Sequence, residues 1–85
     1  MRIPVVTIAD DRRTGPPPLG LADILWALAG PQDGIEHIHI APNPGRAVIT
    51  YFLQARDDRS AIDTARKVTD RAITQAPALR GWRRI

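Results

Sequence analysis

The chain contains no cysteine among its 85 residues. This absence excludes disulfide bonds, thiolate nucleophiles and zinc sites built on cysteine. Serine occurs once, as Ser60, and the chain has no G-x-S-x-G, G-x-G-x-x-G or Walker sequence. Neither a hydrolase nucleophile elbow nor a nucleotide-binding loop is therefore indicated. The only lysine, Lys67, lies in a charged helical stretch, where it is not desolvated as a nucleophilic lysine must be.

Long apolar runs are also missing. The longest, Leu19 to Ala29, is interrupted by Gly20 and Asp23 and is far shorter than the ~20 residues that cross a bilayer. The first residues lead into a short alternating run that lacks the apolar core and cleavage site of a signal peptide. We therefore expect a cytoplasmic protein without a membrane segment.

The overall composition is that of a globular protein, with 44% hydrophobic and 25% charged residues. The length predicts one domain, residues 1–85, with a thin core that favours oligomerisation. The net charge is +3, and eleven of the twelve basic residues are arginine. We read this arginine usage as codon bias of a high-GC genome rather than as a nucleic-acid footprint.

Hydrophobic patterning divides the chain into four strands and two helices. β-Branched and alternating segments predict strands, whereas Leu21, Ile24, Leu25 and Leu28 follow helical spacing. A capping box of Ser60 and Asp63 predicts the start of the second helix, and Pro77 ends it. The predicted strands are Arg2–Ala9, Ile35–Ala41, Ala47–Ala55 and Leu79–Ile85, and the predicted helices are Leu19–Ala29 and a segment from Ser60 to the residues before Pro77.

This order predicts a βαββαβ α+β domain of the ferredoxin-like type. A tight turn at Asn43–Arg46, with Gly45 supplying a positive φ, joins the second and third strands as a hairpin. The four-stranded antiparallel sheet would carry both helices on one face. Its other face would be open to water, a ligand or a partner.

Strand alternation predicts which side chains lie on that open side. Ala47, Ile49, Tyr51 and Leu53 should face the helices together with Ile38 and Ile40, with Glu36 near the rim. The side opposite the helices is more apolar than a fully solvated sheet face should be. We therefore expect a homodimer that packs sheet to sheet, or a protein partner, at an interface formed by Ile35, His37, His39, Val48, Thr50 and Phe52.

His37 and His39 are the candidate catalytic residues if the protein is an enzyme. Their spacing of two on a strand places both imidazoles on one face, and histidine titrates near neutral pH. Either side chain could act as a general acid or base in a pocket shared by two subunits. Cyclases, isomerases and cofactor-free oxygenases occur among small dimeric ferredoxin-like proteins, which is an analogy of fold alone.

The same histidine pair would need a third ligand to hold a metal ion. Asp10, Asp11, Asp33 and Glu36 are possible oxygen donors, but none has motif spacing. We expect no metal and no cofactor.

A C-terminal cluster of Arg80, Trp82, Arg83 and Arg84 is the candidate nucleic-acid surface. Arginines beside an exposed tryptophan can grip phosphates and stack on bases. The alternative, which we favour, is a core tryptophan with solvated arginines. In the third-strand segment, Arg46 and Val48 stand where RNA-recognition modules carry the aromatic side chains that stack on bases, so we do not expect a nucleic-acid partner.

The segment from Tyr51 to Trp82 combines a strand, an Ala/Arg-rich helix and the run Pro77-Ala78-Leu79-Arg80-Gly81-Trp82. It resembles small uncharacterised actinobacterial proteins. The resemblance implies another small bacterial protein without assigned activity, and it carries over no functional residue. Our first hypothesis is a non-catalytic interaction or regulatory protein, the second is a small dimeric enzyme, and the third is a weak nucleic-acid binder.

Overall fold

The computed structural model describes residues 1–12 and 14–85, which form an α+β fold in the predicted βαββαβ order. Two short 3₁₀ turns, η1 (Pro31–Asp33) and η2 (Pro77–Leu79), follow the two helices. The strands and helices are β1 (Val5–Ala9), α1 (Leu21–Leu28), β2 (Ile35–Asn43), β3 (Arg46–Leu53), α2 (Asp58–Gln75) and β4 (Arg83–Arg84).

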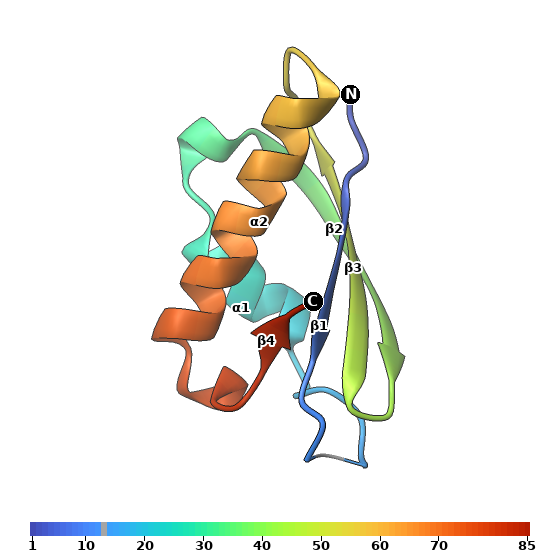
Figure 1. Ribbon diagram of the computed structural model, residues 1–85. Coiled ribbons are helices and arrows are strands. Elements are labelled where there is room, and N and C mark those ends of the chain that lie inside the picture. The colour runs from blue at the N-terminus through green and yellow to red at the C-terminus, as the bar shows by residue number, and fades with distance from the viewer. Residues whose placement is uncertain (13) are drawn as a thin grey trace.

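The four strands form one sheet in the order β2-β3-β1-β4, and every pairing is antiparallel. β3 lies between β1 and β2, and β1 lies between β3 and β4. Each β-α-β unit therefore holds one strand of the other unit between its own two strands. Both helices lie on the same side of the sheet, to its left in Figure 1, and the opposite side carries no helix of the described chain. The predicted four-stranded antiparallel sheet with two helices is confirmed.

The core lies between the sheet and the two helices. Ala47, Ile49, Tyr51 and Leu53 of β3 are fully buried, as the period-two alternation of a half-buried strand predicts. Apolar side chains from β1 and from both helices complete the core, among them Val6, Ile8, Leu25, Ala65, Val68 and Ala72.

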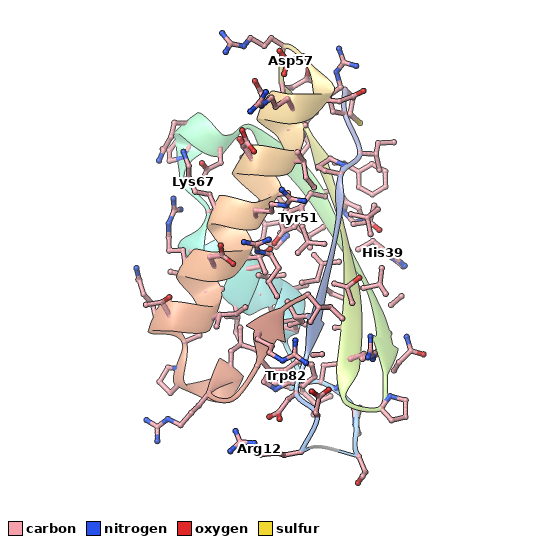
Figure 2. The ribbon with its side chains drawn as sticks, viewed as in Figure 1. Arg12, His39, Tyr51, Asp57, Lys67 and Trp82 are labelled. Carbon is pink, nitrogen blue, oxygen red and sulfur yellow. The ribbon has the colours of Figure 1, made fainter. Side chains whose placement is uncertain are left out.

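One polar contact crosses this core. The Tyr51 hydroxyl lies 2.7 Å from Thr69 Oγ1, and Thr69 Oγ1 donates to the Ala65 carbonyl at 2.8 Å. Because the single hydroxyl hydrogen of Thr69 is used in the second bond, Tyr51 donates in the first. Burial raises the pKa of Tyr51 to about 12. A buried tyrosine therefore ties β3 to the middle of α2 (Figure 2).

The start of α2 differs from the prediction. Asp57, with extended φ and ψ, is the residue before the helix, and its Oδ1 accepts the Ser60 backbone N–H at 2.7 Å. Ser60 is thus the third residue of the helix, and the predicted Ser60–Asp63 capping box is wrong. Aspartate and serine cap helices about equally well, so the sequence Asp57-Asp58-Arg59-Ser60 permitted either start.

α1 is shorter than predicted and begins at Leu21 rather than Leu19. Gly20 precedes it with a φ of 75°, a conformation that glycine adopts without strain. At its other end, the buried Asp33 accepts the Gly30 N–H at 2.7 Å and faces Arg71 Nη1 of α2 at 3.4 Å. The same Nη1 donates to the Leu28 carbonyl at 2.6 Å. Arg71 therefore fastens the C-terminal end of α1 to α2.

The predicted final strand Leu79–Ile85 is mostly wrong. Arg83 and Arg84 pair with β1 and the Ile85 N–H donates to the Thr7 carbonyl at 2.9 Å, whereas Leu79 belongs to the η2 turn that starts at Pro77. Leu79 and Trp82 are both buried. The η2 turn and Gly81, with a φ of 90°, direct both of these side chains into the core although they are three residues apart. The apolar spacing of this segment is that of a turn rather than of a strand.

Across residues 1–12 and 14–85, no helix combines the length and the apolar character that crossing a membrane requires.

Candidate functional site

The side of the sheet opposite the helices presents a surface that we call the open face. β1, β2 and β3 contribute one row of side chains each, and strand register sets which residues are neighbours. His39 points away from the helices on this side, whereas Tyr51 points towards α2 (Figure 2). The open face consists of Val5, Thr7, His37, His39, Ala41, Val48, Thr50 and Phe52.

The centre of the open face is apolar and uncharged. Val5 pairs in register with Thr50, and Thr7 pairs with Val48. Val5 has half of its surface (51%) exposed, and Val48, Thr50 and Phe52 are half-buried without any helix over them. Exposed apolar patches on a sheet face are a feature of interaction surfaces.

One predicted interface residue lies on the other side of the sheet. A register shift between Ile35 and His37 leaves Glu36 without a partner, so that Ile35 pairs with Leu53 and His37 with Phe52. Because Leu53 faces the helices, Ile35 does too, and its side chain packs against the core. The predicted placement of Ile35 on the open side is therefore wrong. A β-bulge inserts one residue and reverses the alternation beyond it.

The two histidines lie at the β2 margin of the open face, and both are exposed. The His37 ring contacts Phe52 with centroids 5.4 Å apart and planes tilted by 52°, while His39 pairs in register with Thr50. Four of the best-formed hollows on the described chain are all lined by other residues. Neither imidazole lines any of these four hollows, and both are open to water in the single chain.

In the part of the chain that the structure describes, no third metal ligand accompanies the histidines. Within residues 1–12 and 14–85, no three His, Asp or Glu side chains come together as a group that could hold a metal ion. Of the four oxygen donors considered above, Asp33 is engaged with Arg71 and Glu36 with Gln54.

The two ends of the open face carry opposite charges. Arg46 starts β3 at the hairpin end and is exposed. Strand parity places its side chain on the same side as Val48 and Thr50. At the far end the exposed Glu36 accepts a hydrogen bond of 2.6 Å from Gln54 Nε2. A cation and an anion therefore lie at opposite ends of the same β2–β3 ladder.

The C-terminal cluster is not arranged for stacking on bases. Trp82 retains 3% of its surface exposure and belongs to the core. Arg83 pairs with Asp11 at 2.6 Å, and Arg84 pairs with Asp70 at 2.8 Å. The hydrogen bond from Arg84 to Asp70 raises the pKa of this arginine. Arg80 is exposed, but its neighbour Trp82 offers no face to a base.

A second apolar surface was not predicted. Leu19 is 98% exposed and Trp26 40% exposed. Residues 16–22 line a groove of about 300 Å³ with Ile40 and Pro42. The sequence of α1 already indicated this surface, because Asp23 is its only charged residue. A helix that is apolar on all sides is usually packed against other elements on more than one side.

No protein-family model, no curated protein and no solved structure matches this chain. The assignment of a function therefore depends on the surfaces described above.

Proposed function

We propose that this chain is a small interaction protein that pairs with a second copy of itself through the open face of its sheet. The observation that carries the proposal is the uncovered apolar centre around Val5 and Val48, with Arg46 and Glu36 at opposite ends. The two interleaved β-α-β units support assigning the arrangement to the ferredoxin-like type, in which one sheet face is left free.

A second copy is the occupant that the charges favour. If a twofold axis runs across the strands, the strands of the two sheets point in opposite directions. The Arg46 end of each copy then lies over the Glu36 end of its partner. Both copies bury the same apolar centre, because a twofold interface uses one patch twice. Packed sheets lie ~10 Å apart, a gap that an arginine and a glutamate together can span.

A small chain gains from this pairing. A single core of 85 residues is thin, and sheet-to-sheet packing provides a second apolar layer at interior density. The open face contains no charged residue at its centre, so packing leaves no unpaired charge within the interface.

The test is a charge exchange followed by sedimentation velocity. The dimer dissociation constant should rise at least fivefold in Arg46→Glu and in Glu36→Arg, because each homodimer then places like charges together twice. An equimolar mixture of the two variants should regain dimers, since every contact in the mixed dimer is again between opposite charges. Arg66→Glu, an exposed position of α2, is the matched control.

Two results would reject the proposal. One is a wild-type chain that stays monomeric up to millimolar concentration. The other is a dimer that neither single variant weakens, which would place the interface on another surface. Both substituted side chains are exposed, so thermal unfolding should confirm that the variants fold.

A further inference from the structure

The outer edge of β2 is an unpaired strand edge. In an antiparallel ladder, alternate residues turn their backbone groups to opposite neighbours. Arg2 and Leu53 exchange backbone hydrogen bonds, and Tyr51 N–H donates to the Pro4 carbonyl. The odd-numbered residues of β3 therefore bond to β1, and its even-numbered residues bond to β2.

This alternation identifies the free groups. Thr50 and Phe52 turn to β2, where they pair with His39 and His37. The residues between and after these histidines, Ile38 and Ile40, must turn their backbone groups outward. No other described residue pairs with those groups. Pro42 has no N–H and closes the free ladder at its end.

An apolar groove runs beside this free edge on the helix side. Ile40 and Pro42 form one wall, and residues 16–22 form the other. Trp26 lies one helical turn beyond Ala22, which lines the groove, and thus extends the same flank of α1. A strand added along Ile38–Ile40 would place alternate side chains in the groove against Leu19 and Trp26, which are 98% and 40% exposed.

The segment that forms the edge and the groove differs in charge from the rest of the chain. All twelve basic residues lie outside residues 14–45, a segment that contains Asp23, Asp33 and Glu36. Asp33 is buried against Arg71, but Asp23 and Glu36 are exposed. A second copy paired along this edge would bring four carboxylates to one seam, so a basic partner fits better.

We propose that the β2 edge binds an extended segment of another protein as a fifth strand, with alternating apolar residues flanked by lysine or arginine. Backbone hydrogen bonds to Ile38 and Ile40 supply the pairing, and the groove selects the alternate apolar side chains, as in other cases of strand addition. Asp23 and Glu36 select the basic flanks. Glu36 lies at the margin shared by the edge and the open face, but the strand pairing uses the outward backbone groups of Ile38 and Ile40, so the proposal does not depend on the dimer.

The test uses a designed peptide, acetyl-Lys-Thr-Val-Thr-Val-Thr-Val-Lys-amide, and amide hydrogen exchange of the full chain followed by NMR. Saturating peptide should slow exchange of the Ile38 and Ile40 amides at least tenfold. The His37 and His39 amides, already bonded to β3, should not change. Asp23→Lys should weaken binding several-fold, whereas the matched control Asp63→Lys on α2 should not.

Three outcomes would overturn the proposal. The first is no binding at millimolar peptide, and the second is equal binding of a peptide with glutamate at both ends. The third is protection of Ile38 and Ile40 in the chain alone as its concentration rises, because a second copy would then occupy the edge. Leu19→Glu should also abolish peptide binding, and its side chain is almost fully exposed, so folding does not obscure the result.

Discussion

Tyr51 is the largest fully buried side chain, and it places a titratable group in the middle of the core. Its hydroxyl donates to Thr69 at 2.7 Å, and burial raises the pKa of Tyr51 to about 12 from a reference of 10.0. The folded protein therefore favours the neutral, protonated form of the Tyr51 side chain. Ionisation would place a charge among Ile49, Leu53 and Val68, which are fully buried.

Alkaline pH should destabilise the protein through this one residue. Since the folded pKa is raised, the contribution to stability is complete below pH 10 and is lost as the pH rises towards 12. The total is about 2–3 kcal/mol. Urea unfolding between pH 8 and pH 12 measures this loss of stability. Tyr51→Phe should remove most of the decrease in the free energy of unfolding with pH. An equally steep slope in the phenylalanine variant would contradict this account.

Asp57 should stabilise α2 from outside the core. Its acceptance of the Ser60 N–H lowers the pKa of its carboxyl below 3.8. The cap therefore stabilises the helix fully above pH 3.8, the ordinary pKa of aspartate. This stabilisation is lost as the pH falls through the lowered pKa of Asp57. Asp57→Ala should reduce the Tm at neutral pH by about a few degrees, whereas Asp57→Asn should retain most of the cap. The deficit of the alanine variant should shrink in strong acid; a deficit independent of pH would argue against a charged cap.

At the scale of elements, Arg71 joins α1 to α2. Its guanidinium donates to the Leu28 carbonyl and faces the buried Asp33. Arg71→Met keeps the aliphatic stem but leaves Asp33 without its cation. We expect a loss of about 1–3 kcal/mol in the free energy of unfolding, below the range for fully buried pairs because Arg71 is partly exposed. Lys67→Met is the matched exposed control on α2, and equal stability of the two variants would reject the role of Arg71.

The sequence predicted best the elements in which buried and exposed residues alternate with one constant spacing from end to end. β3 alternates without interruption from Ala47 to Leu53, so its buried side could be assigned from the residues alone. The facing of His37, His39, Val48, Thr50 and Phe52 followed from the same rule. Their use as an interface stays a prediction.

The wrong predictions lie where a single residue changes the period. The bulge at Glu36 turns Ile35 towards the core, and no residue type in Ile35-Glu36-His37 distinguishes a bulge from a regular strand. The segment after Pro77 was read as a strand because its basic residues alternate, but tertiary packing of Leu79 and Trp82 decides its course. The β2 edge was not predicted, because hydrophobic patterning alone does not specify the order of the strands in the sheet.

At the scale of the whole molecule, the centre of the open face should control self-association. Val48 lies between Thr7 and Ala41 in register and is half-buried on a side without helices. Val48→Glu should abolish the dimer, because each copy would bury an unpaired carboxylate in the apolar interface. Sedimentation should then report a monomer with unchanged far-UV circular dichroism. Thr74→Glu, at an exposed position of α2, should leave the dimer intact.

The most direct measurement is the molar mass of the wild-type chain in solution, followed by light scattering from low micromolar to millimolar concentration. The chain mass is 9.4 kDa. Self-association through the open face predicts a mass that rises to about twice this value and stops there, because a twofold interface closes on itself. A mass that stays at that of one chain, or one that keeps growing beyond two, would contradict the account.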